Sequence, residues 1–138
     1  MALARGWGFS LLVLISVLSV LQLFFFGALV SRARGRYGVI APAVSGHETF
    51  ERYFRVQMNT LELLVMFLPA LWLGSLYIAP VWPVALGVLY LLARLLYLRS
   101  YVADPRKRGA GFGLSVLPIL VLLLIALVGC IRRLILFH

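Results

Sequence analysis

Residues 50–66 read FERYFRVQMNTLELLVM, so a charged segment runs without a turn signal into the most hydrophobic part of the chain. Arg55, Asn59 and Glu62 recur at i, i+4 and i+7, which places them within about 60° of one another on one helical face. The helix continues as LLVMFLPALWLGSLY over residues 63–77. An uncompensated charge near the edge of a hydrocarbon layer costs roughly 2 to 3 kcal/mol or more. We therefore expect Glu62 to have a partner.

The composition predicts a membrane-embedded protein. The 138 residues are 64% hydrophobic and 12% charged, whereas soluble domains are about a quarter charged. In a soluble protein the net charge of +9 would suggest nucleic acid or another anionic partner. Here the positive residues gather in the loops between apolar runs, which argues against nucleic acid. Cys130, the single cysteine, cannot form an internal disulfide and is interpreted as a small apolar residue.

Four apolar runs are close to or longer than the roughly 20 residues that a helix needs to cross a bilayer. The first is longer than the roughly 7 to 15 apolar residues of a signal peptide, so we expect it to be retained. The chain is thus predicted to be a single all-α membrane domain over residues 1–138, a four-transmembrane-helix bundle. The predicted spans are about 7–31, 55–77, 84–102 and 114–136.

Local signals shape these spans. Residues 32–49 are rich in Gly, Pro and Arg and predict a water-facing loop. Thr49 is expected to cap the second helix. Pro69 should bend its helix without ending it, because neighbouring helices can absorb the lost hydrogen bond, and Pro118 interrupts the fourth span. Gln22, the one strongly polar residue of the first run, should bond a neighbouring helix.

Positive charge is concentrated in loops 32–54 and 103–112. Four spans put these two loops on the same side of the membrane, and the excess of Lys and Arg predicts that this side is the cytoplasm, with both termini opposite. Arg94, Tyr97 and Tyr101 form a polar face near one end of the third span. That polar end and the polar end of the second helix should therefore lie at the same membrane face.

The polar residues that these helices and loops collect at one membrane face are mostly cationic, with one carboxylate. Arginine grips carboxylates with two parallel hydrogen bonds, and a glutamate can hold an ammonium group, so the set suits a small anionic, zwitterionic molecule. Two histidines and scattered acids disfavour a metal site and a Ser/His/acid triad. The residues are Arg34, Arg55, Asn59, Glu62, Arg94, Tyr97, Tyr101 and Arg108.

Two other interpretations use the same residues or the same spans. Glu62 and one arginine could form a buried pair that joins two helices, with the tyrosines as interfacial belt residues. Buried ion pairs contribute little net stability, so several intramembrane arginines favour a ligand instead. A small multidrug exporter would need an acid in its first helix to couple protons, and residues 7–31 contain none.

Two stretches resemble the MAPEG family of membrane proteins of eicosanoid and glutathione metabolism. The first is GHETFERYFRVQMNTLE at residues 46–62, and the second is ARLLYLRSY at residues 93–101, followed by the basic stretch KRGAGF. The likeness is to the branch with the type 2 and type 3 microsomal glutathione transferases and the leukotriene synthase that conjugates glutathione. It covers the whole chain.

The resemblance implies a homotrimer in which glutathione binds between adjacent subunits near the cytoplasmic face. Arg108 falls on the position that stabilises the glutathione thiolate. Glutathione would be the cosubstrate, and no metal would be needed. A lipophilic electrophile or a lipid hydroperoxide would enter from the lipid. The implied activity is that of a glutathione transferase, and glutathione peroxidase activity is left open. The alternative is a non-catalytic, lipid-binding or scaffold member. The implied glutathione-binding residues are Arg34, Arg55, Gln57, Asn59, Glu62, Arg94, Tyr97 and Tyr101.

The chain departs from the family pattern at three positions. Leu63 replaces a frequent aromatic residue, Gly35 replaces a second arginine beside the first-helix one, and Thr60 replaces a cysteine without a clear chemical consequence. These departures favour a general transferase over a dedicated eicosanoid enzyme. We therefore expect the bacterial inner membrane rather than the endoplasmic reticulum.

Overall fold

The chain forms four long helices in a computed structural model that describes residues 2–137, with side chains from residue 6 onward. No strand occurs among these residues. All four helices are long and apolar enough to cross a membrane, which confirms the predicted all-α four-helix membrane fold. Their bounds are α1 Ala2–Tyr37, α2 Glu48–Ser75, α3 Val81–Ala103 and α4 Gly109–Leu136, with a short 3-10 helix, η1, at Pro105–Arg108.

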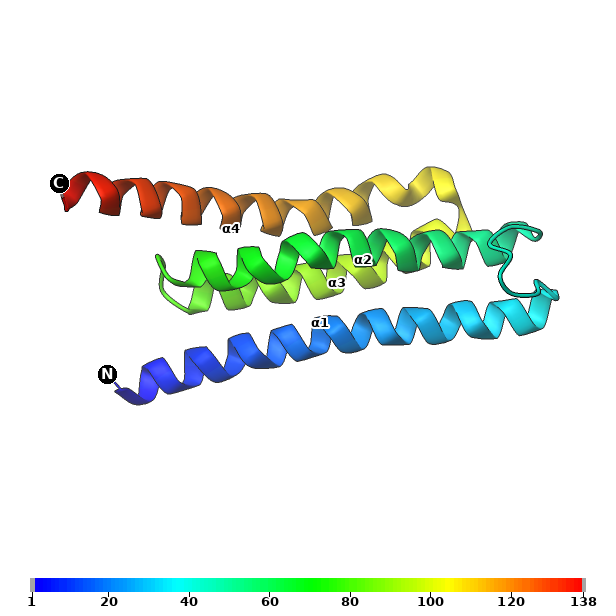
Figure 1. Ribbon diagram of the computed structural model, residues 1–138, viewed down its shortest axis with the longest axis horizontal. Coiled ribbons are helices and arrows are strands. Elements are labelled where there is room, and N and C mark those ends of the chain that lie inside the picture. The colour runs from blue at the N-terminus through cyan, green and yellow to red at the C-terminus, as the bar shows by residue number, and fades with distance from the viewer. Residues whose placement is uncertain (1, 138) are drawn as a thin grey trace.

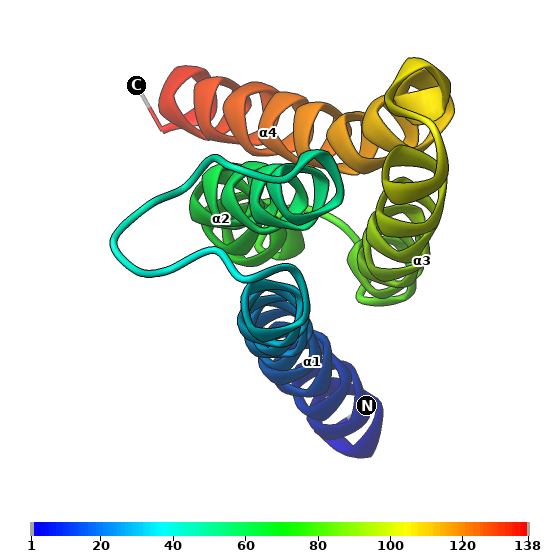
Figure 2. The ribbon, with the colours of Figure 1, turned by 90° about the vertical axis from the view of Figure 1, so that its right-hand side faces the viewer.

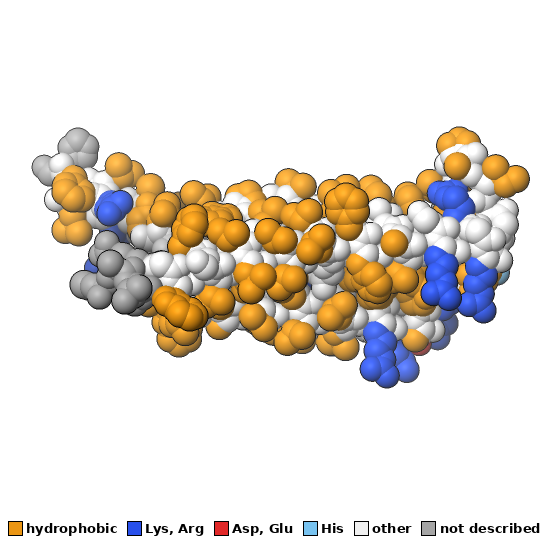
Figure 3. Space-filling view, turned by 90° about the horizontal axis from the view of Figure 1, so that it is seen from below, with side chains coloured by type: hydrophobic (Ala, Val, Ile, Leu, Met, Phe, Trp, Pro, Cys, Tyr) orange, Lys and Arg blue, Asp and Glu red, His pale blue; other side chains and the backbone are white. Residues whose placement is uncertain are grey.

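The helices lie side by side along the long axis of the molecule (Figure 1). The α1–α2 loop and η1 lie at one end, which we call the basic end, and the α2–α3 turn lies at the other end with both termini. Viewed from the basic end, α2 lies between α1 and α4, with α3 beside it (Figure 2). Positive side chains gather mostly at the basic end of a hydrophobic surface (Figure 3). This charge pattern marks one membrane edge of the bundle.

Apolar and aromatic side chains fill the bundle. Phe67 of α2 stacks on Tyr90 of α3 with ring centroids 3.8 Å apart, and both are fully buried. Nearer the basic end, Phe26, Val56 and Tyr97 form a separate buried cluster that joins three helices. The polar residues of α2 and α3 therefore rest on a packed apolar base.

The first helix is longer than predicted. It continues to Tyr37, so Arg32, Arg34 and Arg36 lie on the helix and not in a loop. It ends before Gly38, whose φ of 68° is left-handed and favours glycine. The arginines mark the edge of the apolar layer, whereas the backbone geometry of Gly38 marks the end of the helix.

The second helix has a different cap from the one predicted. The His47 side chain accepts a hydrogen bond at Nδ1 from the backbone N–H of Thr49, 3.2 Å away, and the helix begins at Glu48. Thr49 therefore lies in the first turn, and the expectation that it is the cap was wrong. A ring nitrogen two residues ahead supplies the acceptor that a hydroxyl was expected to provide.

Two other local predictions are confirmed. Pro69 lies inside α2 without ending it. The Gln22 Nε2 group donates to the carbonyl of Leu91 on α3 at 2.9 Å. Pro118 likewise lies inside α4, and Asp104 leaves helical geometry with φ −154°, which ends α3 before Pro105.

Candidate functional site

Arg94 is the best-bonded polar side chain of the bundle interior. It is fully buried. Its Nε and Nη2 groups donate to Thr60 Oγ1 at 3.2 and 2.7 Å, Nη2 also donates to Asn59 Oδ1 at 3.1 Å, and Nη1 donates to Ser115 Oγ at 3.4 Å. The guanidinium lies 4.2 Å from the centre of the Tyr97 ring. Neutral oxygens and an aromatic face therefore hold a buried cation that joins α2, α3 and α4.

Two residues of this network were missed by the sequence reasoning. Thr60 accepts from Arg94 and donates to the carbonyl of Val56 at 2.7 Å, so its hydroxyl has a structural role that was not expected. Ser115 donates to the carbonyl of Gly111 at 2.6 Å while accepting from Arg94. The available signal was a small hydroxyl residue within an apolar run, which is typical of contacts between membrane helices.

Glycine brings α4 very close to α3 at this level. A Cβ atom at Gly111 would lie 2.7 Å from both the Cα and the N of Tyr97. The Tyr97 ring is buried and stacks on Tyr101 with centroids 5.4 Å apart. Arg108 is the last residue of η1 and directly precedes α4. The close approach at Gly111 thus holds the start of α4, and Arg108 just before it, near the two tyrosines.

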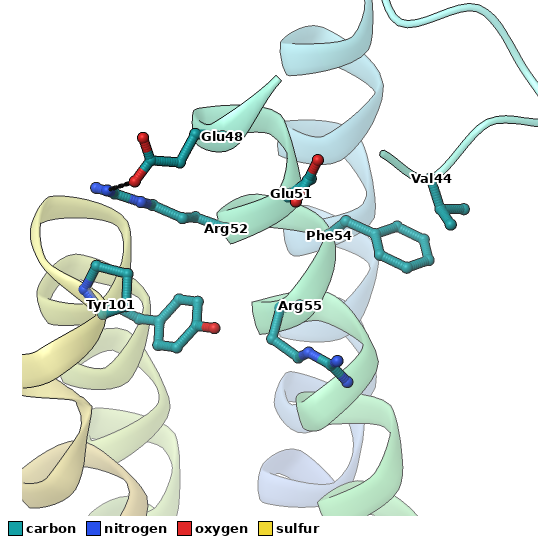
Figure 4. Close-up of a pocket in the computed structure, with 8 residues that line it drawn as sticks. Val44, Glu48, Glu51, Arg52, Phe54, Arg55 and Tyr101 are labelled. Carbon is teal, nitrogen blue, oxygen red and sulfur yellow. Dashed lines mark hydrogen bonds and ion pairs between the residues drawn. The ribbon is translucent and has the colours of Figure 1, made fainter. Parts of the chain in front are cut away.

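A cleft of about 410 Å³ opens at the basic end between α2 and the end of α3. In Figure 4 the Tyr101 ring extends from α3 toward the space beside Arg55 of α2. Both side chains are only partly covered or exposed, so a ligand could reach them from the membrane edge. The lining residues are Val44, Glu48, Glu51, Arg52, Phe54, Arg55, Tyr101 and Pro105.

Arg52 holds the two walls of this cleft together. Its Nη1 group donates to the last carbonyls of α3, Val102 at 3.0 Å and Ala103 at 3.2 Å, and its Nη2 group pairs with Glu48 (Figure 4). A cation at a helix C-terminus satisfies orphan carbonyls and interacts favourably with the helix dipole. Arg52 therefore fixes the end of α3 against the start of α2.

Two of the predicted ligand residues lie elsewhere in the chain. Arg34 donates to the carbonyls of Val39 at 3.3 Å and Ala43 at 2.6 Å, so it is bound to its own α1–α2 loop. Gln57 lines a separate groove of about 550 Å³ with α1 residues that include Gly27. One chain therefore does not bring Arg34 and Gln57 to the cleft that holds Arg55 and Tyr101.

Glu62 is exposed on α2 and has no hydrogen bond or ion pair with any side chain from residue 6 to 137. The expected partner of Glu62 is thus not found among the described residues. The alternative, a buried pair between Glu62 and an arginine that joins two helices, is not found among them either. A carboxylate on an apolar helix strongly favours a counter-charge.

The fold and the site define an all-α, multi-pass membrane protein with a polar cleft at one membrane edge. The chain belongs to the MAPEG family, since the model of that family matches residues 12–128, and the resemblance inferred from the sequence is confirmed. Among the residues described, no group of three or more His, Cys, Asp or Glu side chains lies together as a metal site.

Several relatives cover most of the chain. It is 46% identical to an uncharacterized protein of the cyanobacterium Synechocystis sp. over 76% of this chain and 77% of that protein. It is 39% identical to microsomal glutathione S-transferase 2 of Mus musculus over 90% and 84% of the two chains. It is 32% identical to leukotriene C4 synthase of Cavia porcellus over 90% of this chain and 83% of that protein.

Proposed function

We propose that this protein is a membrane glutathione transferase that joins the sulfur of glutathione to lipophilic electrophiles. The observation that carries the proposal is the cleft lined by Arg55 and Tyr101 at the basic end, beside the buried Arg94 network, with Arg108 directly before α4. Relatives named as microsomal glutathione S-transferase 2 and leukotriene C4 synthase support it.

Glutathione carries two carboxylates, one ammonium group and one thiol, which matches the proposed donors in kind. Arg55 and Tyr101 line the cleft and are free to bind a carboxylate, since a guanidinium fork bonds both of its oxygens. Glu62 is the carboxylate proposed to hold the ammonium group. Asn59, Arg94 and Tyr97 lie beneath as the support that keeps this wall in place.

The remaining proposed ligand residues require a second copy of the chain. Arg34 and Gln57 lie on the α1 side of α2, away from the cleft. A neighbouring subunit could bring them to the same glutathione molecule, and its positive groups could pair with the exposed Glu62. We propose the homotrimer that the family resemblance implies, with each site between two subunits.

Arg108 is proposed as the catalytic residue. It is exposed directly before α4, where its positive side chain favours an anion. A nearby guanidinium lowers the pKa of a thiol from about 8.5, and each unit represents about 1.4 kcal/mol in favour of the thiolate. The thiolate attacks the electrophilic carbon, a C–S bond forms, and the leaving group departs with the bonding electrons. The same thiolate would carry any peroxidase activity on lipid hydroperoxides.

The activity can be tested with purified protein in detergent. We expect ultraviolet absorbance of bound glutathione thiolate and conjugation of a model aryl halide. Arg108→Ala should abolish turnover and thiolate absorbance while glutathione binding survives in part. Arg106→Ala is the matched control, because Arg106 is an exposed arginine of the same short helix. Wild-type protein with neither signal would contradict the proposal and would favour the non-catalytic, lipid-binding alternative.

We propose that the basic end faces the cytoplasm of a bacterial inner membrane. The orientation follows from the excess of Lys and Arg at that end. The bacterial assignment is supported by the cyanobacterial relative and by the departures at Leu63 and Gly35.

A further inference from the structure

A second cleft lies at the basic end and shares no residue with the first. It has a volume of about 230 Å³ and lies between the end of α1 and the start of α2. None of its residues belongs to the proposed glutathione site. The lining residues are Leu29, Arg32, Ala33, Arg36, Tyr37 and Tyr53.

Two arginines of this cleft have no hydrogen-bond or ion-pair partner within the part of the chain described. Arg32 and Arg36 are one turn apart on α1, both are exposed, and neither forms a hydrogen bond or ion pair with a residue from 6 to 137. Like charges at this spacing repel each other. An anion held between the two guanidinium groups would offset that repulsion and accept hydrogen bonds from both of them.

One wall of the cleft is held in position. The Arg36 guanidinium lies 5.7 Å from the centre of the Tyr37 ring, and the other neighbour of that ring is His47, stacked at 4.0 Å. His47 in turn caps α2. Through His47, Tyr37 is therefore held against the start of α2, the helix that also carries Tyr53. Both tyrosines have a hydroxyl group that can donate a hydrogen bond to an anion.

An apolar strip leads away from the cleft along α1. Phe25 and Leu18 precede Arg32 at seven-residue intervals, which share one helical face with a drift of about 20° per step. Their side chains are exposed by 51% and 40%. The strip runs from the basic end into the membrane-spanning part of α1, where it faces outward from this chain.

We propose that this cleft binds the phosphate of an anionic phospholipid, whose acyl chain lies along Phe25 and toward Leu18. Basic pockets between membrane helices suit anionic lipid headgroups. A free phosphate would use only the arginines, whereas a phospholipid also covers the apolar strip. The inference does not depend on the proposed glutathione chemistry.

The test uses full-length protein in zwitterionic detergent, titrated with dioctanoyl phosphatidylglycerol by calorimetry. Dioctanoyl phosphatidylcholine and inorganic phosphate are the comparison probes. Wild-type protein should bind phosphatidylglycerol much more tightly than either. The double variant R32Q/R36Q should bind it at least about tenfold more weakly. The control R106Q/K107Q removes the same charge at the same end and should change the affinity by less than about threefold.

A second variant, which removes one oxygen atom, tests the proposal even if the double variant does not fold. Tyr53→Phe keeps the ring that packs beside Phe50 and removes only its hydroxyl, so it should fold and weaken phosphatidylglycerol binding about threefold or more. Conjugation activity in phosphatidylcholine micelles should be unchanged in all these variants. The proposal is overturned if R32Q/R36Q binds phosphatidylglycerol as tightly as the wild type does. If the double variant does not fold, the same result with Tyr53→Phe overturns it. Equal losses in R106Q/K107Q, or inorganic phosphate binding as tightly as the lipid, would overturn it as well.

Discussion

At the scale of single residues, the buried guanidinium of Arg94 determines how the polar face is built. Its acceptors are all neutral, and they come from α2 and α4. Asn59 bonds Arg94 at 3.1 Å, so part of the polar stripe read from the sequence serves the interior of the chain. The residues free to meet a ligand are those at the ends of the network, such as Arg55 and Tyr101.

Thr60→Val tests this network. The substitution keeps the shape of the side chain but removes the oxygen that accepts from two Arg94 nitrogens, leaving buried donors unsatisfied. We expect the free energy of unfolding to fall by about 1 to 3 kcal/mol, measured as a lower thermal midpoint in detergent. Ser100→Ala is the control, because the Ser100 hydroxyl bonds only carbonyls of its own helix. Equal midpoints for the two variants would show that the Thr60 bonds contribute little.

At the scale of elements, Gly111 allows a close contact between α3 and α4. At Gly111 an added Cβ would meet the backbone of Tyr97, which cannot rotate away. The same contact sets the start of α4, and with it Arg108. Helix packing and the position of the proposed catalytic residue therefore depend on one glycine.

Gly111→Ala should separate α4 from α3. We expect destabilisation of about 1 to 3 kcal/mol from overpacking, together with weaker thiolate absorbance of bound glutathione because Arg108 moves. Gly113→Ala is a matched control in the same helix, since an added Cβ there meets nothing within 4 Å. The control should be neutral or slightly stabilising, because alanine favours a helix. The interpretation fails if both variants keep wild-type midpoints and thiolate absorbance.

At the scale of the whole molecule, the distribution of polar residues favours an assembly. Within a single chain, one small molecule cannot contact all of the proposed ligand residues. Arg34 and Gln57 lie on one side, and Arg55 and Tyr101 lie on the other. The exposed Glu62 likewise has no partner among residues 6–137. Sites shared between neighbouring subunits would account for both observations.

Subunit complementation tests the shared site. Arg34→Ala and Arg55→Ala should each greatly reduce conjugation of a model aryl halide when expressed alone. Co-expressed with separate affinity tags and purified through both, the two variants should recover part of the activity, because some interfaces then combine both intact arginines. Mixed oligomers as inactive as the single variants would place both arginines in one chain's site. Native mass spectrometry should show three copies.

The proposed membrane orientation is tested by surface labelling. Cys130 is the single cysteine, so Cys130→Ser provides a background into which Ala43→Cys, in the exposed α1–α2 loop, can be introduced. A membrane-impermeant maleimide should label this variant in inverted vesicles and not in intact cells. The reverse pattern would mean that the basic end faces outward.

Much of the local structure could be predicted from the sequence, with instructive exceptions. Gln22 was predicted to bond a neighbouring helix, and it does. The α1 helix was predicted to end near residue 31 because Gly, Pro and Arg follow there, but it continues to Tyr37. The cap of α2 was assigned to Thr49 because threonine is a common helix cap, whereas the acceptor in the structure is the ring nitrogen of His47.

The sequence by itself determined four membrane-length helices and the gathering of positive charge at one end, because span length and composition are local properties of the chain. Only the tertiary structure decided that Arg94 is bonded inside the bundle by Thr60 and Ser115. It also decided that Arg34 is bound to its own loop. The physical reason is that the partner of each side chain depends on which helix faces meet, and packing between distant segments decides that.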